Sequence, residues 1–215
     1  MEETIMPDVQ VIGLPQSNYV WAVRIALAEK GVAHESILAP PHSPEVAAIH
    51  PLGKIPVLRH GTVALAESRA IIDYVDATFD GPPLVPADGE AALRSAMWTS
   101  IITSSVEPLL VRQYVLAHMF PATEDGQPDR VLIEALAPKV EAALDVLDKA
   151  VSAGEIGGEG IERVDAYLVP ILFYLSNTPA GGNMIAARSK LSEYLARRLA
   201  QPSVRSTMPP PPERS

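Results

Sequence analysis

Residues with hydrogen-bonding side chains gather at two places where an apolar run meets a helical pattern. Ser17, Asn18 and Tyr19 stand before one such helical segment, and Glu67 and Ser68 stand before another. Taken alone, each serine is explained as a helix N-cap whose oxygen accepts a backbone N–H, and Glu67 suits the positive end of a helix. The chemistry that such groups could do is to hold an anion at a helix N-terminus.

The types of residue present exclude several other kinds of chemistry. The chain has no cysteine, which removes disulfides, thiolate metal sites and any protein thiol nucleophile, so sulfur chemistry would need an external thiol. Its five histidines, at positions 34, 42, 50, 60 and 118, show no metal-ligand spacing, and we expect no metal. The net charge of -9 and a pI near 5.0 argue against nucleic acid, because a phosphate backbone requires clustered Lys and Arg.

The length and composition indicate a globular protein. With 215 residues, 47% of them hydrophobic, the chain has material for one large domain or two small ones. No stretch approaches the roughly 18 to 20 unbroken apolar residues of a membrane span, and the N-terminus lacks the basic-then-apolar pattern of a signal peptide. We therefore expect a cytoplasmic protein without a membrane partner.

The elements that would position these residues alternate between strand and helix over the first 80 residues. The first strand, helix and second strand form a unit whose length implies a right-handed crossover and a parallel pair. The next two extended runs flank Gly61, which predicts an antiparallel hairpin. The expected elements are a strand at 9–14, a helix at 19–31, a strand at 34–38, a hairpin within 55–68 and a helix at 68–78.

Beyond residue 90 the apolar spacing is helical, which predicts an α-helical bundle with helical segments at 91–120, 129–151, 163–176 and 184–201. Pro108, Pro138 and Pro170 lie inside its helical segments. Each proline removes a backbone hydrogen bond at a cost of about 3 kcal/mol, so we expect kinks or interrupted helices. The proline-rich tail after Met208 is expected to be a surface strap or disordered.

The order of these elements and five local motifs resemble the cytosolic glutathione transferase superfamily. The motifs are SNYVWAVRIALAEKGVAHE, HPLGKIPVL, LAESRAIIDYVD, ERVDAYLVPIL and LARRLAQPSVRST, and the resemblance covers nearly the whole chain. It implies an α/β thioredoxin-like domain with a mixed four-stranded sheet, followed by an all-α domain. The implied boundaries are 1–80 for the glutathione-binding domain, 81–90 for a linker, 91–208 for the helical domain that contributes the electrophile site, and 209–215 for a disordered tail.

The resemblance also implies how glutathione is held. A cis Pro56 would turn the backbone of Ile55 outward, so that its N–H and C=O pair with the cysteinyl part of glutathione like an added strand. Glu67 and Ser68 would hold the γ-glutamyl group, because its ammonium pairs with a carboxylate and its carboxylate with a hydroxyl and helix N–H groups. The glycyl carboxylate would meet Lys54, with His50 as the second candidate.

The same resemblance places the activating hydroxyl at Ser17, by alignment of the SxxSxRVR-type classes on residues 22–24. A free thiol has a pKa near 8.5, and lowering it by about two units requires roughly 2.7 kcal/mol of preferential stabilisation of the anion. A helix N-terminus supplies about 0.3 to 1 kcal/mol, up to around 2, and a hydroxyl donating to a charged acceptor adds about 1.5 to 3 kcal/mol. Ser17 would thus donate to the thiolate and not act as a nucleophile. Tyr19 and Asn18 stay open as donors, because a one-residue change in the turn reorients all three side chains.

Two departures from the family pattern stand out. Ser17 is followed by Asn18 and Tyr19 in place of the Ser-Cys pair of the zeta class, so the class is left unassigned and a maleylacetoacetate-type isomerisation is disfavoured. Glu162 stands three residues before Asp165, where the family carries Ser or Thr. We therefore expect that a standard capping box cannot form there.

The function implied is a cytoplasmic detoxification enzyme, a homodimer that joins glutathione to a small, largely apolar electrophile. Isomerase or glutathione peroxidase side activity is compatible with this site. The alternative is a non-catalytic protein of the same fold that binds or scaffolds partners. The residues retained at the glutathione-binding positions argue against this non-catalytic alternative; they are Ser17, Lys54, Pro56, Glu67 and Ser68.

Overall fold

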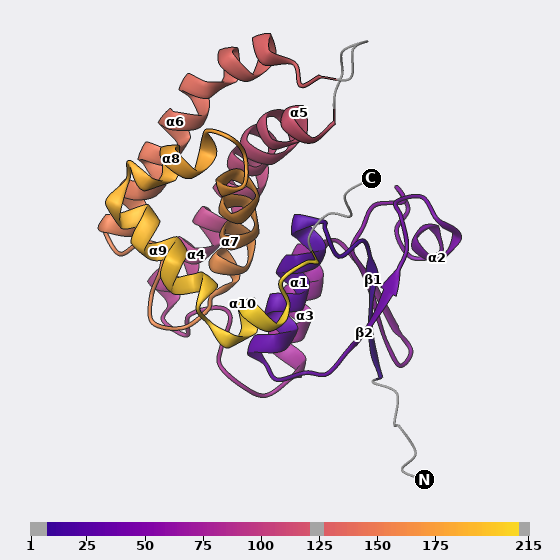
Figure 1. The fold of residues 1–215 in the computed structure, drawn as a ribbon. Coiled ribbons are helices and arrows are strands. Elements are labelled where there is room, and N and C mark those ends of the chain that lie inside the picture. Colours follow the sequence, from indigo (N-terminus) through magenta and orange to yellow (C-terminus); the bar gives the residue numbers. More distant parts are fainter. Residues whose placement is uncertain (1–7, 121–126, 211–215) are drawn as a thin grey trace. The chain divides into compact units, whose positions relative to one another are not determined.

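The computed structural model describes residues 8–120 and 127–210, and the chain divides into two compact units (Figure 1). The first unit runs to Leu84 and includes the segment from Gln201 onward, and the second is Val85–Ala200. Residues 201–208, which we expected in the helical domain, therefore group with the first unit. Within the tail predicted to be disordered, residues 211–215 lie outside the described residues.

The first unit contains a four-stranded mixed sheet in the order β2-β1-β3-β4. Its strands are β1 (Val9–Gly13), β2 (Glu35–Leu38), β3 (Val57–His60) and β4 (Val63–Ala66). Strand β1 pairs with β2 in parallel and with β3 in antiparallel fashion, and β3 and β4 form the hairpin. The parallel pair, the hairpin and the thioredoxin-like fold class are thereby confirmed.

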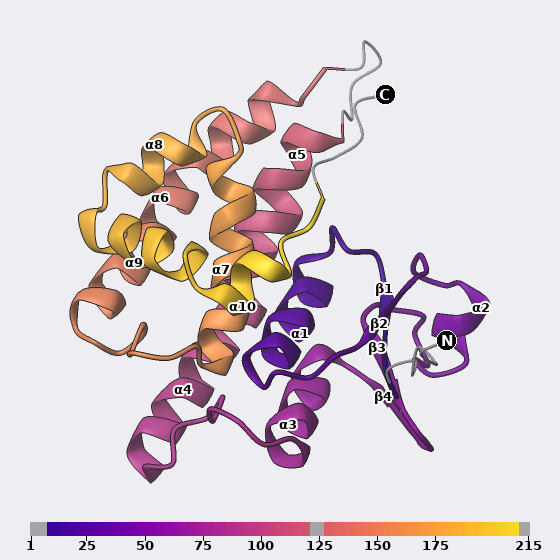
Figure 2. The same cartoon turned by 60° about the horizontal axis from the view of Figure 1, so that its bottom comes forward.

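Helices cover both faces of this sheet. Helices α1 (Asn18–Glu29) and α3 (Ser68–Thr78) pack against one face, and the short α2 (Pro44–Ala47) lies on the other (Figures 1 and 2). Helix α1 is followed by Gly31 at φ 68°, a left-handed conformation that glycine adopts without steric cost. Helix α3 has the bounds predicted from its apolar spacing, whereas α2 is too short to leave a periodic signal.

The second unit is all-α, as predicted. Its central helix, α7 (Arg163–Ser176), has apolar side chains buried around most of its circumference, and most of the other segments contact it. The other segments of this unit are α4 (Gly89–Ile101), π-helical η1 (Ile102–Val106) and η2 (Pro108–Val115), α5 (Leu116–Met119), α6 (Arg130–Ser152), α8 (Gly181–Ala186) and α9 (Ser189–Leu199). None of the helices described is long and apolar enough to cross a membrane.

Proline interrupts the α pattern at only one of the three expected positions. Around Pro108 the backbone adopts the π-helical segments η1 and η2. Helices α6 and α7 instead continue through Pro138 and Pro170. Pro170 is buried in the core helix, where packing offsets the lost backbone hydrogen bond.

The first turn of α7 is held by a buried polar network. The N–H of Glu162 donates to Oδ2 of Asp165 over 2.8 Å, and the two residues form a reciprocal capping box. The expectation that Glu162 prevents such a box is wrong, because its carboxylate supplies the acceptor that a Ser or Thr hydroxyl would otherwise provide. Arg198 binds both oxygens of Asp165 at 3.2 Å, and Tyr194 donates to Oδ1 at 2.7 Å. Burial raises the pKa of Tyr194 well above its usual value, so the phenol keeps the proton that it donates.

The segment after Ala200 returns to the first unit and packs against α1 through helix α10 (Pro202–Ser206). The indole Nε1 of Trp21, which is fully buried, donates to Oγ1 of Thr207 over 3.0 Å. The backbone N–H of Trp21 also donates to the carbonyl of Ser17. The end of the described chain is thus attached to the first turn of α1.

This attachment gives a stability prediction. Thr207→Val removes the acceptor of the buried indole N–H while keeping the side-chain shape, and we expect the free energy of unfolding to fall by about 1 to 3 kcal/mol. Urea denaturation followed by circular dichroism measures it. The neighbouring Ser206→Ala, at an exposed position, serves as the control. Equal midpoints for the two variants would contradict the prediction.

Candidate functional site

The register of the sheet brings three chain segments to one edge. Ile12 of β1 pairs with Val57 of β3, and Val57 pairs with Ala66 of β4. Because β3 runs antiparallel to both neighbours, the end of β1, the start of β3 and the end of β4 lie side by side. The residues that follow β1, precede β3 and follow β4 therefore emerge together, and they include most of the residues predicted to bind glutathione.

A glycine permits close approach between two of these segments. A Cβ atom on Gly13, the last residue of β1, would lie 2.6 Å from Cγ2 of Val20 and 3.3 Å from Cβ of Ile55. No side chain fits at that separation, so glycine is required there. The start of α1 consequently sits against the turn that carries Ile55.

Ser17 occupies the N-cap position of α1. Its backbone is extended, with φ -70° and ψ 127°, and its Oγ accepts the N–H of Val20 over a long 3.4 Å. A hydroxyl that accepts in this way still has its own proton to donate, and the described chain supplies no acceptor for it. Asn18 and Tyr19 are the first two residues of α1 itself. All three side chains are half-buried at the helix N-terminus.

The peptide bond between Ile55 and Pro56 is cis, as the resemblance implied. Pro56 is buried, and within the described chain no backbone hydrogen bond joins Ile55 to another residue. The N–H and C=O of Ile55 are therefore available to an extended peptide. Lys54 precedes this turn, and its side chain is exposed.

Glu67 and Ser68 begin helix α3. Glu67 is its N-cap, and its backbone lies in the left-handed region at φ 69°, which is uncommon for a residue with a side chain and recurs at ligand-binding sites. Its side chain does not cap the helix; it is 68% exposed, and Oε1 lies 3.1 Å from Nε2 of His50. His50 is buried behind it, 3% exposed, and its Nδ1 accepts the N–H of Leu52.

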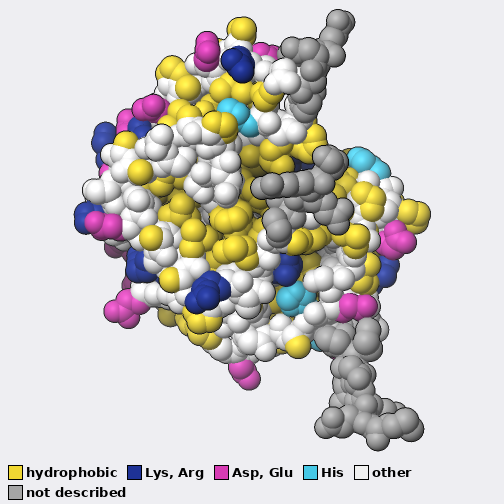
Figure 3. Space-filling view, viewed as in Figure 1, with side chains coloured by type: hydrophobic (Ala, Val, Ile, Leu, Met, Phe, Trp, Pro, Cys, Tyr) yellow, Lys and Arg dark blue, Asp and Glu magenta, His cyan; other side chains and the backbone are white. Residues whose placement is uncertain are grey.

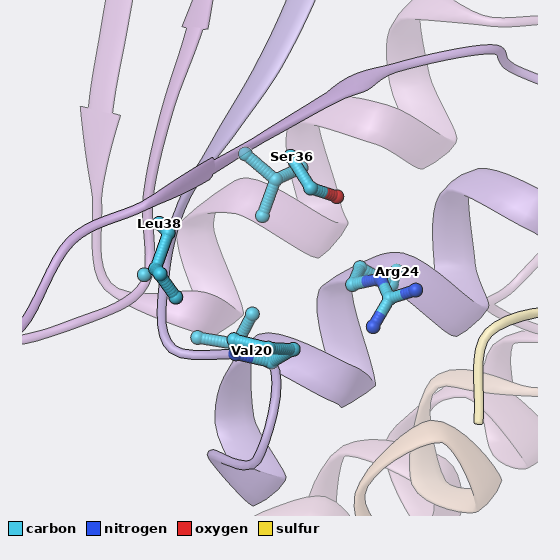
Figure 4. Close-up of a pocket in the computed structure, with 7 residues that line it drawn as sticks. Val20, Arg24, Ser36 and Leu38 are labelled. Carbon is cyan, nitrogen blue, oxygen red and sulfur yellow. The ribbon is translucent and has the colours of Figure 1, made fainter. Parts of the chain in front are cut away.

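A separate cavity lies between β1, β2 and α1 (Figure 4). Its volume is about 90 Å³, and Val20, Arg24, Ser36 and Leu38 are among its lining residues. Sites for small organic ligands usually enclose roughly 300 to 1,000 Å³, so this cavity is too small for a tripeptide. None of the predicted site residues lines it.

The charge distribution on one face agrees with the acidic composition. In Figure 3, Lys and Arg side chains stand singly among Asp and Glu side chains and do not merge into a continuous basic patch on the face shown.

In sequence and in structure, this chain is similar to glutathione transferases. A family model described as glutathione S-transferase, N-terminal domain, matches residues 11–83, which contain every predicted site residue. The solved structure of glutathione S-transferase III in its apo form has a TM-score of 0.80 and 27% identity, covering 95% of this chain and 99% of that one. The family model thus matches most of the first unit, and the chain is similar to glutathione transferases along nearly its whole length. Glutathione S-transferase 3 of Zea mays is 27% identical to this chain, over 98% of this chain and 100% of the relative.

Not every relative of this chain has a transferase name. The stringent starvation protein A homolog of Pasteurella multocida is 29% identical, over 83% of this chain and 80% of that protein. The similarity therefore shows the fold, whereas the transferase activity of this chain is a proposal.

The structure places most of the predicted residues at one edge of the sheet, and it gives Lys54 and His50 different surroundings. Ser17, Ile55 and Glu67 lie on segments at the same sheet edge. Lys54 is exposed beside them, whereas both ring nitrogens of His50 contact protein atoms. The contact of His50 with Glu67 spans 17 residues of sequence, and no spacing pattern could have indicated it.

Proposed function

We propose that this chain is a glutathione transferase that holds glutathione as a thiolate at the shared sheet edge. The observation that carries the proposal is the hydroxyl of Ser17, placed at the N-terminus of α1 with a proton still to donate. The helix dipole and the donated hydrogen bond both favour an anion there. The opening of α1 is thus suited to stabilising sulfur in its charged form.

The neighbouring segments suit the rest of the tripeptide. Its cysteinyl backbone would pair with Ile55, and its γ-glutamyl ammonium would meet the exposed carboxylate of Glu67. The γ-glutamyl carboxylate would lie at the N-terminus of α3, at Ser68, and the glycyl carboxylate would pair with Lys54. Each charged group of the tripeptide then has either an oppositely charged partner or a hydrogen-bond donor.

The reaction proposed is attack of the bound thiolate on an electrophilic carbon of a small, largely apolar co-substrate. The thiol proton leaves to solvent, a sulfur–carbon bond forms, and the leaving group departs with its bonding electron pair. Thiolate formation and proximity carry the catalysis, and no protein atom becomes covalently attached. Isomerase or peroxidase side activity at the same thiolate is compatible with this site.

Two measurements test the proposal. Calorimetry with glutathione should show saturable binding at millimolar concentrations or below, and an aryl halide should be consumed in a glutathione-dependent manner. Absence of both heat and saturation would rule the proposal out. Binding without turnover across several classes of electrophile would instead favour the non-catalytic alternative.

Lys54 gives a test of the predicted ligand orientation. Lys54→Gln removes an exposed charge that would pair with the glycyl carboxylate, so the KM for glutathione should rise about two- to fivefold, with kcat at saturation unchanged. Lys139→Gln, an exposed lysine of α6, makes the same charge change in the other unit and serves as the control. Equal KM values in the two variants would contradict the orientation.

We also propose, from the family resemblance, a cytoplasmic homodimer with a role in detoxification. Light scattering coupled to size-exclusion chromatography measures the mass of the assembly. A mass of one chain across the micromolar range would contradict the dimer.

A further inference from the structure

We propose that His50 is a positioning residue that sets the carboxylate of Glu67 for the γ-glutamyl ammonium of glutathione, and does not itself contact the ligand. This rests on the proposed function. The sequence suggested His50 as a second partner for the glycyl carboxylate, and the hydrogen bonds around its ring lead to a different role.

The tautomer of His50 follows from its neighbours. The N–H of Leu52 donates to Nδ1 over 3.0 Å, so Nδ1 carries a lone pair and the ring proton resides on Nε2. That proton is directed at Oε1 of Glu67, 3.1 Å away. Both ring nitrogens are therefore engaged, and neither is left to meet a ligand carboxylate.

The ring is also fixed in place. His50 is 3% exposed, its backbone N–H donates to the carbonyl of Val46 over 2.8 Å, and its carbonyl accepts the N–H of Gly53 over 2.9 Å. A donor held by these contacts cannot follow a moving side chain. It therefore defines one direction for the carboxylate that it contacts.

Glu67 needs such a constraint. Its side chain is 68% exposed and would otherwise sample several rotamers, which a ligand would have to restrict on binding. With Oε1 on His50, the second oxygen, Oε2, has no hydrogen-bond partner in the described chain. The carboxylate is thereby oriented with one oxygen available to an ammonium group.

Two substitutions separate the two hydrogen bonds of His50. In His50→Asn, the amide oxygen can still accept the N–H of Leu52, but the side chain is too short to reach Glu67. In His50→Gln, the amide N–H reaches as far as Nε2 and can still donate to Glu67, but the acceptor for Leu52 is lost. The first variant therefore tests positioning, and the second tests the local turn.

We expect His50→Asn to raise the KM for glutathione about three- to tenfold, the effect of losing one hydrogen bond, with kcat at saturating glutathione within about twofold of the wild type. His50→Gln should retain most of the wild-type affinity. A glutathione analogue lacking the γ-glutamyl amino group should bind wild type and His50→Asn equally. In a Glu67→Ala background, His50→Asn should have no further effect on KM.

The results that would contradict the positioning role of His50 differ from the result that would contradict the proposed function. A wild-type KM in His50→Asn, or an equal loss of affinity for glutathione and for the deaminated analogue, would overturn the positioning role. The same conclusion would follow if His50→Gln lost as much affinity as His50→Asn while both variants kept the wild-type circular dichroism spectrum. If the wild-type chain bound no glutathione at all, the proposed function itself would fail.

Discussion

Replacing Ser17 by alanine is expected to raise the pKa of bound glutathione by about one to two units and to lower turnover at neutral pH about ten- to a hundredfold. A hydroxyl donating to a charged acceptor contributes about 1.5 to 3 kcal/mol, and one pKa unit corresponds to about 1.4 kcal/mol. The dipole of α1 remains in the variant, so part of the stabilisation is kept. Calorimetry should find the affinity for glutathione little changed, because the tripeptide keeps its other contacts.

The measurement is the ultraviolet absorbance of the thiolate as a function of pH, with glutathione bound. Ser17→Ala also weakens the helix cap, which costs about 0.5 to 2 kcal/mol of stability. Ser17→Gly removes the same hydroxyl but costs only a few tenths of a kcal/mol as a cap, so it separates loss of the donor from loss of the cap. Tyr19→Phe and Asn18→Ala test the two neighbouring donors. An unchanged titration in Ser17→Ala, with a shift in one of these variants, would reassign the donor.

Asp165→Ala is expected to lower the free energy of unfolding by about 3 to 5 kcal/mol. Asp165 and Arg198 are both fully buried, and the substitution leaves the guanidinium without its buried counter-charge. It also removes the acceptor of the Tyr194 hydroxyl and half of the cap of α7. Urea denaturation followed by circular dichroism checks this, with the midpoint and the slope fitted separately.

Two further variants calibrate that result. Tyr194→Phe removes a single donor to the same carboxylate and should cost about 1.5 to 3 kcal/mol, less than Asp165→Ala. Glu193→Gln removes an exposed ion pair on the same helix and should leave the denaturation midpoint unchanged. Asp165→Ala with the midpoint of the wild type would show that the buried pair does not stabilise the fold.

The sequence predicted the long periodic elements well and the short ones poorly. The helices at 68–78 and 163–176 have the bounds expected from their apolar spacing, because a buried stripe repeats over several turns. The segment 184–201 reads as one helix, yet the chain forms α8 and α9 with a break at Arg188. Arg188 there binds Asp145 of α6 over 2.7 Å, a contact between distant segments that local spacing does not encode.

Sequence alone determined the alternation of strand and helix, the all-α second half and, through the family motifs, the residues to examine at the glutathione site. Tertiary structure decided how those residues act. The register of β1, β3 and β4 brings the segments that carry Ser17 and Glu67 to the same sheet edge. The contacts of His50 with Glu67 and of Trp21 with Thr207 span 17 and 186 residues. Periodicity and capping describe neighbours along the chain, whereas a hydrogen bond between distant residues depends on the folded path that brings its two atoms together.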